Sequence, residues 1–303
     1  MLFTIAIPTF NNIKTIENTF KSCLGQDYEN EYEILIVDNC CTDGSDLLFK
    51  NWSNTYKNVK VIRNHETVSL FENHNVCLRN AIGKYVLFCH SDDCLNVNAL
   101  KLLEKKIIEK YCPDKYVLWG SSLFRDFYVN LSNTGIHFNQ ILSGERAYLP
   151  FFYGGLTPSG TCYSRKIFIE KGGFLKQSHK CAHCDATTML FLANDGFEFE
   201  MMDRIIFLRR DASTAIRQGS FDNECIAWQA AIEELIKKVG EEQFLEISRH
   251  SLTLQNIPLA YYIVLLNFGY FKKEILKKFL RPKNLIRALL YKNYRILLKA
   301  LIR

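Results

Sequence analysis

Short apolar runs alternate with amphipathic segments of helical length over the first 120 residues, and this alternation limits the possible folds more than any other feature of the sequence. Strands are predicted at 3–7, 33–38, 59–63, 84–89 and 115–120, and helices at 13–25, 43–53, 70–81 and 97–110. Strands that are joined through helices pair in parallel, with right-handed crossovers. The sequence therefore predicts an α/β fold with a doubly wound, mostly parallel sheet.

The alternation ends near residue 121, where glycine pairs and short strands replace it. Residues 221–256 and 258–302 are predicted to be helical, with only Pro258 and Pro282 as breakers. We expect two parts, an α/β domain over 1–220 and a helical C-terminal region over 221–303.

Positive charge is concentrated at the C-terminal end. The chain carries a net charge of +6, but residues 272–303 hold eleven Lys and Arg against one acid, Glu274, which leaves a net charge of −4 for the rest. Apolar residues recur between these cations at helical spacing, and a basic amphipathic helix suits an anionic bilayer. We expect residues 258–303 to associate with an anionic membrane surface. A helical hairpin that closes the domain, or an oligomer contact, is the alternative.

Eleven cysteines are present, and several of them fall inside apolar segments, where cysteine behaves as a small hydrophobic residue. The N-terminus has no basic region ahead of its first apolar run, so we expect no signal peptide. These features favour a reducing cytosol.

Two adjacent carboxylates, Asp92 and Asp93, follow the apolar run 85–89 directly. In open α/β sheets ligands bind at the carboxyl ends of the strands. Neighbouring carboxylates repel one another unless a cation or hydrogen-bond donors offset their charge. Mg²⁺ and Mn²⁺ take carboxylate and phosphate oxygens together, so the pair suggests a metal-bound nucleotide diphosphate. A helix cap before Asn96 is the simpler alternative.

Polar groups also follow the first two predicted strands, at residues 8–11 and at Asp38. Together with the acidic pair, this set resembles the inverting family-2 glycosyltransferases of the GT-A fold, over roughly residues 2 to 215. The resemblance rests on three segments in the family's order: 5–11 (IAIPTFN), 36–45 (IVDNCCTDGS), and Asn75 followed by AIGKYVLF and then SDD within 75–93.

The resemblance implies a role for each strand end. Pro8, Thr9 and Phe10 would line the base pocket, with Phe10 or its neighbours packed on a pyrimidine ring. Asp38 would accept a hydrogen bond from the ring N–H of uracil or thymine, although an Asx turn or helix cap would also explain an Asp there. Asn64 would complete the nucleotide pocket, unless it is a turn residue.

The acidic pair would then hold the ribose and the metal. The resemblance gives Asp92 the ribose or the metal, and Asp93 a Mn²⁺ or Mg²⁺ ion that bridges the diphosphate and neutralises the departing nucleotide. Many relatives carry an Asp two places before this pair, whereas this chain has His90. A neutral imidazole can still donate a hydrogen bond near a diphosphate.

The catalytic base is expected further along the chain. Family members place a Gly-Gly-Phe ahead of an acidic residue at a helix start, and here 172–174 precede Asp185. Asp185 would take the proton from the acceptor hydroxyl as that oxygen attacks the anomeric carbon. An N-cap role for Asp185 is compatible with this one.

The same region offers a metal alternative. His179, Cys181, His183 and Cys184 are residue types that bind zinc, and Cys181 and Cys184 have a ligand spacing. Structural zinc sites usually pair two such clusters, and the sequence offers no second one.

Together with these residues, the resemblance implies a metal-dependent inverting glycosyltransferase that uses a nucleotide-diphosphate sugar, with UDP favoured over dTDP. The resemblance implies a saccharide acceptor, lipid-linked, in O-antigen, capsule or lipooligosaccharide synthesis, and an enzyme peripheral to the inner face of the cell membrane. A nucleotidyltransferase-like enzyme is the alternative, but residues 8–12 lack the glycine-rich phosphate loop common in that class. We expect no nucleic-acid partner, because residues 1–271 are net acidic and show no helix-turn-helix, zinc-finger or aromatic RNA-binding strand motif.

Overall fold

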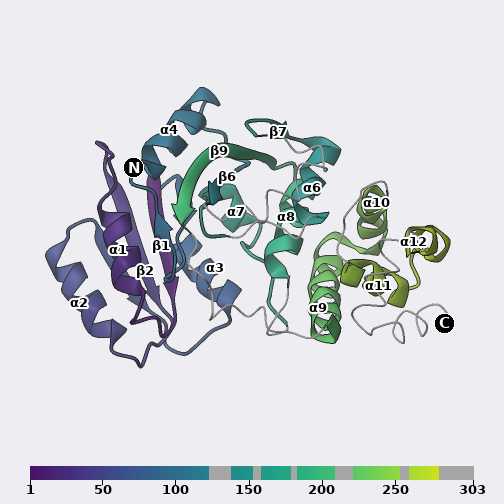
Figure 1. Cartoon of the computed structure of the whole chain (residues 1–303), viewed down its shortest axis with the longest axis horizontal. Helices are drawn as coiled ribbons and strands as arrows, with labels where there is room; N and C mark the ends of the chain where they lie inside the picture. Colours follow the sequence, from purple (N-terminus) through teal and green to yellow (C-terminus); the bar gives the residue numbers. More distant parts are fainter. Residues whose placement is uncertain (123–137, 153–157, 179–182, 209–220, 253–258, 280–303) are drawn as a thin grey trace.

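The computed structural model describes residues 1–122, 138–152, 158–178, 183–208, 221–252 and 259–279. Within these ranges nine strands form one sheet of order β3-β2-β1-β4-β8-β6-β9-β5, with β7 paired to β9 (Figure 1). The strands are β1 Phe3–Thr9, β2 Tyr32–Asp38, β3 Val59–Arg63, β4 Tyr85–Phe88, β5 Cys94–Leu95, β6 Tyr116–Ser122, β7 Ile141–Leu142, β8 Thr161–Ser164 and β9 Glu198–Leu208. The helices of the sheet layers are α1 Ile16–Leu24, α2 Ser45–Thr55, α3 Leu70–Asn80, α4 Ala99–Glu109, η2 Gly144–Tyr148, α6 Leu149–Phe152, α7 Arg165–Glu170 and α8 Cys184–Asn194.

The first half of the sheet is parallel, as predicted. Strands β3, β2, β1 and β4 pair in parallel, and α1, α2 and α3 connect them. Every residue of β1 and β2 is buried, because helices cover both faces of a sheet of this kind. The α/β prediction is therefore confirmed.

Beyond β4 the sheet is mixed. Strand β8 lies antiparallel between β4 and β6, so β6 runs in the same direction as β4 without touching it. Strand β9 pairs in parallel with β6, while β5 and β7 pair with β9 in the opposite direction. The predicted strand at 115–120 exists, but its neighbours in the sheet come from residues far along the chain.

Two apolar clusters cover the two faces of the sheet. Alternation along β1 sends Ile5 and Ile7 to one face, where α1, α2 and α4 pack, and Ala6 to the other, where α3, α7 and α8 pack. A residue shift in register would exchange these faces, so the apolar pattern fixes the pairing.

A tight turn brings the chain into β4 and explains the Ala-Ile-Gly segment. A Cβ atom on Gly83 would lie 2.4 Å from the backbone nitrogen of Thr4, so only glycine fits. The Gly83 N–H donates to Thr4 Oγ1 at 2.9 Å, and Thr4 Oγ1 donates to Glu33 Oε2 at 2.6 Å. Glu33 Oε2 also accepts from the Ile82 N–H at 3.0 Å. The Ala-Ile-Gly segment that the chain shares with the family pattern therefore shapes the turn into β4.

The C-terminal region contains helices α9 Phe221–Val239, α10 Glu241–Ser251, α11 Leu259–Asn267 and α12 Lys272–Phe279. The described part of the predicted helical region 221–256 is helical, but Gly240 adopts a φ of 85° and separates α9 from α10, a break that the sequence did not predict. Gly269, with a φ of 80°, likewise lies between α11 and α12 and adds a break that the two prolines did not predict.

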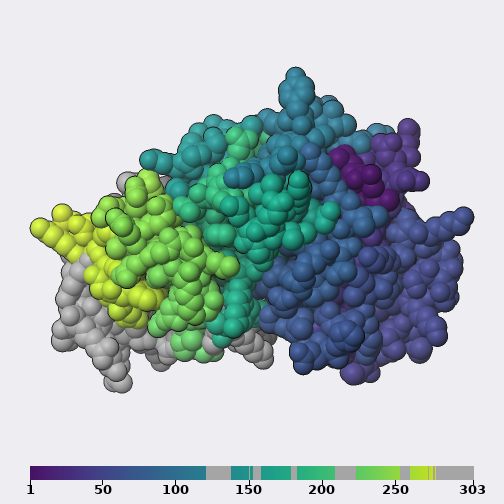
Figure 2. All heavy atoms as spheres, turned by 180° about the vertical axis from the view of Figure 1, so that it is seen from behind, coloured from purple at the N-terminus to yellow at the C-terminus, as the bar shows by residue number. Residues whose placement is uncertain are grey.

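These helices pack on the sheet domain at one end of the molecule (Figures 1 and 2). A third apolar cluster joins Phe151 and Phe152 of α6, and Leu190 of α8, to side chains of α9, α10, α11 and α12. Helix α11 is buried there, so this segment of the predicted membrane-binding region 258–303 is a core helix. No helix among the described residues is long and apolar enough to cross a membrane.

Candidate active site

The strand register brings three predicted site positions to one edge of the sheet. Thr9 pairs with Asp38, and Asp38 pairs with Arg63, at the carboxyl ends of β1, β2 and β3. Ala6 pairs with Phe88, so the loop of residues 90–93 leaves β4 at the same edge. The side chains that the sequence singled out along the first 93 residues therefore gather at the ligand-binding edge of the sheet.

Asp38 is almost completely buried and is held from two sides. Its Oδ1 accepts from the Cys41 N–H at 2.7 Å, and its Oδ2 accepts from the Arg63 guanidinium at 2.5 Å. Arg63 also donates to the Cys41 carbonyl at 3.1 Å. The nearby carboxylate of Asp38 raises the pKa of Arg63. The Cys41 N–H lies three residues after Asp38, one residue beyond the reach of the Asx turn considered from the sequence. The two bonds leave Asp38 as an oriented carboxylate at the carboxyl edge of the sheet.

The other predicted base-pocket residues lie beside Asp38. Pro8 and Thr9 are buried at the end of β1, and Phe10 is 48% exposed just beyond it. Among the described residues, the buried Thr9 hydroxyl has no hydrogen-bond partner. An exposed ring beside a buried polar edge is a surface on which a flat base can stack.

Asn64 is engaged in a network of amides. Its Nδ2 donates to Asn39 Oδ1 at 2.9 Å and to Asn73 Oδ1 at 2.8 Å. Asn39 in turn accepts from the Val68 N–H at 2.9 Å. The Asn64 side-chain nitrogen therefore ties the loop after β3 to α3.

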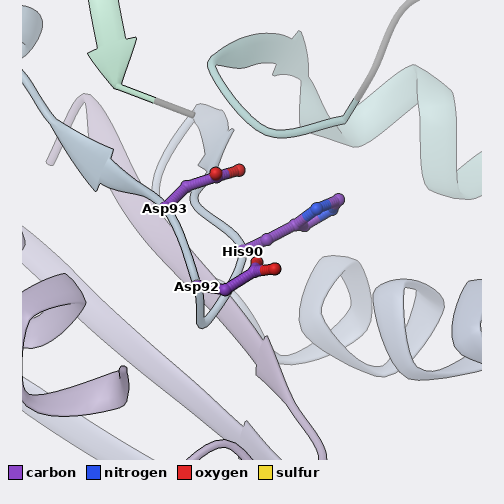
Figure 3. A group of neighbouring side chains, drawn as sticks. All are labelled: His90, Asp92 and Asp93. Carbon is purple, nitrogen blue, oxygen red and sulfur yellow. The ribbon is translucent and has the colours of Figure 1, made fainter. Parts of the chain in front are cut away.

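The loop after β4 presents His90, Asp92 and Asp93 on the same side (Figure 3). One ring nitrogen of His90 and one carboxylate oxygen from each aspartate all lie within 4.8 Å of one another. One nitrogen and two oxygens at this spacing fit a divalent cation, and this is the one such group among the described residues. The sequence predicted Asp92 and Asp93 as metal ligands and did not predict His90.

Helix α1 holds this loop in place. Thr19 Oγ1 donates to the Asp93 carbonyl at 2.7 Å, and Thr15 Oγ1 donates to the Ser91 carbonyl at 2.8 Å. The His90 N–H donates to Ser159 Oγ at 3.1 Å, which ties the loop to residues 158–160. The backbone of the acidic loop is thus fixed before any ligand binds.

A second histidine lies behind His90. His74 of α3 is completely buried, with Nδ1 2.7 Å from the Leu70 carbonyl and Nε2 3.0 Å from Nε2 of His90. Burial, and next the neighbouring His90, lower the pKa of His74 to about 3. Sequence reasoning missed His74, because a histidine in an amphipathic helix carries no signal until its partner is known.

Asn75 explains another part of the family pattern. It accepts from the Phe174 N–H at 2.8 Å and donates to the Phe174 carbonyl at 3.0 Å. A Cβ atom on Gly173, whose φ is 73°, would lie 2.3 Å from Asn75 Oδ1. Asn75 and the Gly-Gly-Phe turn therefore fit together, and the Leu175 N–H continues the attachment to Thr188 of α8 at 3.0 Å.

Helix α8 carries Asp185 in its first turn. Asp185 Oδ1 accepts from the Ala186 N–H at 2.8 Å. The N-cap of α8 is His183, so the N-cap role considered for Asp185 is wrong, and Asp185 lies inside the first turn. Burial raises the pKa of Asp185 from 3.8 to about 6, against the effect of that hydrogen bond. Burial, and next the charge of Asp185, raise the pKa of Tyr163 on β8, which places the carboxylate close to the strand beside β4. A carboxylate with this pKa can accept a proton near neutral pH.

Two of the four residues of the zinc alternative, His183 and Cys184, are among the described residues. His179 and Cys181 lie outside the described residues. The His183 ring stacks on Trp228 at 4.3 Å, and the Cys184 thiol is buried and donates to the Lys176 carbonyl at 3.5 Å. Those contacts give both described members a packing role. None of the described cysteines forms a disulfide.

Arg63 is the second residue that sequence reasoning missed. It ends β3 in line with Asp38, so its position in the parallel register was predictable once β2 and β3 were paired. An Arg at a strand end is otherwise indistinguishable from a surface charge, since half of its side chain is exposed.

Comparison with known proteins finds a family match and several similar relatives. Residues 4–169 match the model of the family described as "Glycosyl transferase family 2". TuaG of Bacillus subtilis, named for teichuronic acid biosynthesis, is 26% identical over 230 residues, which is 76% of this chain and 84% of TuaG. The poly(ribitol-phosphate) beta-N-acetylglucosaminyltransferase TarS of Staphylococcus aureus is 36% identical over 104 residues, 33% of this chain, and that match spans 18% of TarS.

Two solved structures share the fold. Residues 1–349 of S. aureus TarS in complex with UDP-GlcNAc superpose with a TM-score of 0.63 at 20% identity, over 97% of this chain and 90% of that one. The mannosyltransferase PcManGT of Pyrobaculum calidifontis, in complex with GDP-Man and Mn²⁺, gives a TM-score of 0.60 at 17% identity, over 99% and 84%.

Proposed function

The chain belongs to glycosyl transferase family 2 and is a glycosyltransferase, and from this premise we propose that it moves a sugar from a nucleotide-diphosphate donor to a saccharide hydroxyl with inversion. The observation that carries the proposal is the shared edge at which Thr9, Asp38 and the 90–93 loop meet. In this proposal the base binds beside Thr9 and Asp38, and the cation binds at the 90–93 loop of the same edge. Membership in this family also removes the nucleotidyltransferase alternative.

The base pocket favours a pyrimidine. Asp38 is a buried carboxylate whose orientation is fixed by Arg63 and the Cys41 N–H. A carboxylate accepts but does not donate, so it discriminates for a ring N–H such as that of uracil or thymine. Phe10 supplies an exposed ring for stacking. UDP is the nucleotide that we propose, and the TarS complex with UDP-GlcNAc supports it by fold alone.

The acidic loop supplies the cation site. Asp92 and Asp93 would hold Mn²⁺ or Mg²⁺. A cation there would neutralise negative charge on the departing diphosphate. The mannosyltransferase that shares the fold is in complex with Mn²⁺, which supports a divalent cation in this proposal.

Asp185 is the general base in this proposal. Its raised pKa of about 6 lets it stay ionised at neutral pH and still bind a proton well. The acceptor oxygen forms a bond to the anomeric carbon while the bond from that carbon to the diphosphate oxygen breaks on the opposite face. Asp185 takes the hydroxyl proton, and the nucleotide diphosphate leaves with the bonding electrons.

The acceptor class follows from the relatives. TuaG is named for teichuronic acid biosynthesis, and RfbV of Salmonella typhimurium, 34% identical over 109 residues, is named an abequosyltransferase. We therefore propose a lipid-linked saccharide acceptor in surface polysaccharide synthesis. With α11 buried in the core, the basic segment 272–303 is the part of the predicted region 258–303 that would attach to the inner face of the membrane and bring the enzyme to such an acceptor. Lys273 and Lys277 of α12 are exposed cations suited to this contact.

The test is a panel of nucleotide sugars incubated with the full chain, Mn²⁺ and a saccharide acceptor, with release of nucleotide diphosphate as the signal. We expect UDP-sugars to be used. Asp93→Ala should abolish metal-stimulated turnover, whereas Asp203→Ala, at an exposed position on β9, should leave turnover unchanged. Asp185→Asn should bind the donor but not transfer it. Turnover of Asp93→Ala at the wild-type rate would refute the cation site.

A further inference from the structure

The contact between His74 and His90 determines which ring nitrogens carry protons. His74 Nδ1 lies 2.7 Å from the Leu70 carbonyl oxygen. A carbonyl oxygen only accepts, so Nδ1 of His74 must carry a hydrogen and donate it. The contact with the Leu70 carbonyl therefore assigns a hydrogen to Nδ1 of His74.

The second nitrogen of His74 follows from burial. His74 is 0% exposed, and the aromatic rings of Phe71, Phe88 and Phe174 lie 5.0 to 5.6 Å from its ring. A charged imidazolium is unfavourable in such surroundings. His74 is thus neutral, and its Nε2 carries a lone pair and accepts.

The donor nitrogen of His90 is then fixed as well. Its Nε2 lies 3.0 Å from Nε2 of His74, so His90 must donate a hydrogen from Nε2. Nδ1 is then the ring nitrogen of His90 that can bind a cation. The buried histidine behind the site thereby determines which nitrogen of His90 faces it as a donor.

This assignment matters because His90 belongs to the group with Asp92 and Asp93. The resemblance places an Asp at this position in many relatives, and an Asp would offer an oxygen where His90 offers a nitrogen. An imidazole nitrogen is a ligand of transition-metal ions, whereas Mg²⁺ is held by oxygens in near-ideal octahedral geometry. Replacing one oxygen donor by nitrogen changes which cation fits.

We propose that His90 ligates the divalent cation through Nδ1, that His74 is a positioning residue which holds His90 in the required tautomer, and that the site therefore selects Mn²⁺ over Mg²⁺. The inference rests on the proposed function only for the presence of a cation. Metal-bound histidines commonly donate their other N–H to a fixed acceptor, and here that acceptor is the lone pair of a buried neutral imidazole.

The tautomers can be measured without metal or substrate. Long-range ¹H–¹⁵N correlation NMR of the full chain labelled with ¹⁵N-histidine distinguishes a protonated from an unprotonated ring nitrogen. Assignment comes from His90→Asp and His74→Gln. We expect a hydrogen on Nε2 of His90 and on Nδ1 of His74. The reverse tautomer at His90 would overturn the proposal, whatever the activity of the enzyme.

The ligand is tested by pulsed electron paramagnetic resonance on Mn²⁺ bound to the protein with UDP. We expect a ¹⁴N coupling in the wild type, its loss in His90→Asp, and its retention in His250→Gln, which changes a histidine on α10. The ratio of Mn²⁺ to Mg²⁺ affinity should fall by at least about tenfold in His90→Asp. Bound Mn²⁺ without ¹⁴N coupling would overturn this proposal while UDP release from the donor still supported the proposed function. Failure of Mn²⁺ to bind at all, with UDP present, would overturn both the ligand and the cation site.

Two variants at His74 separate positioning from packing. The amide oxygen of Gln can accept from Nε2 of His90, whereas Leu fills the space without an acceptor. We expect His74→Leu to weaken Mn²⁺ binding about tenfold and His74→Gln to retain most of it. Equal Mn²⁺ affinity in both variants would remove the positioning role. The tautomer measurement on the wild type decides the matter if His74→Leu does not fold.

Discussion

Replacing Asp185 by Asn should make the protein more stable while it removes transfer. Burial raises the pKa of this carboxyl from 3.8 to about 6, so the folded state binds its proton more tightly than the unfolded state does. Each pKa unit corresponds to 1.36 kcal/mol, which gives an upper limit of about 3 kcal/mol against the folded state when Asp185 is ionised. Asp185 is partly accessible, so solvent reduces that figure and we expect about 1 to 3 kcal/mol.

The sign of the effect sets its pH dependence. Above pH 6 the folded protein carries an ionised, buried carboxylate, and the full penalty applies. As the pH falls through 6 the penalty declines, and below about 4 it is absent, because the carboxyl is protonated in both states. Asp185→Asn lacks the penalty at every pH, so its advantage should be largest near pH 7.5 and vanish below pH 4.

The assay compares urea unfolding of the wild type, Asp185→Asn and the exposed control Asp203→Asn at pH 7.5, 6 and 4.5. In parallel, kcat/KM of the wild type should decline on the acid side with an apparent pKa near 6. An Asp185→Asn protein that is no more stable than the wild type at pH 7.5 would refute the raised pKa. A variant that retains near-normal transfer would remove Asp185 as the base.

Three further outcomes are expected. Arg63→Gln should weaken UDP binding about tenfold to a hundredfold in calorimetry, because Asp38 loses the charge-assisted hydrogen bond that orients it; unchanged affinity would mean that Asp38 does not contact the base. Asn75→Ala should lower the melting temperature, because it leaves the Phe174 N–H and carbonyl without partners, and each unpaired group should cost about 1 to 3 kcal/mol of unfolding free energy. An unaltered melting temperature would show that the turn at residues 172–174 is stable without the two hydrogen bonds to Asn75. Lys273→Glu together with Lys277→Glu should reduce salt-sensitive sedimentation with anionic vesicles, by about 1 kcal/mol for each lysine removed, whereas equal sedimentation with neutral vesicles would argue against an electrostatic membrane contact.

The parallel half of the fold could be predicted from the sequence because its information is local. Each of the first four strands is an apolar run, and each connecting segment has a helical pattern, so pairing follows from the crossover rule. The order β4-β8-β6-β9 was not predictable in this way, because β8 and β9 come from residues 161–164 and 198–208 and reach the sheet after long connections. The break at Gly240 was missed because a glycine inside a helical pattern is often tolerated.

Some residues of the candidate site also have a local signal in the sequence, and others do not. Thr9, Asp38, Asp92 and Asp93 are recognisable because they follow strands directly, where chemistry concentrates in this fold class. His74 and Arg63 act through contacts with residues 16 and 25 positions away, so neither has a local signal. Asn75 and Gly83 carried a strong family signal for a structural reason, since they shape turns that hold α8 and β4.

Helix α8 contributes apolar side chains to two clusters, one on each of its faces. Met189 and Leu192 contribute to the cluster that covers the sheet, while Ala186 and Leu190 contribute to the cluster shared with the C-terminal helices. A truncated enzyme that stops before α9 would expose the outer face of the helix that carries Asp185, so we expect such a fragment to aggregate. Exchange of C-terminal regions between relatives would succeed only if the replacement supplied a matching apolar surface. Engineers who seek new acceptor specificity should therefore transplant α8 together with the helices that follow it.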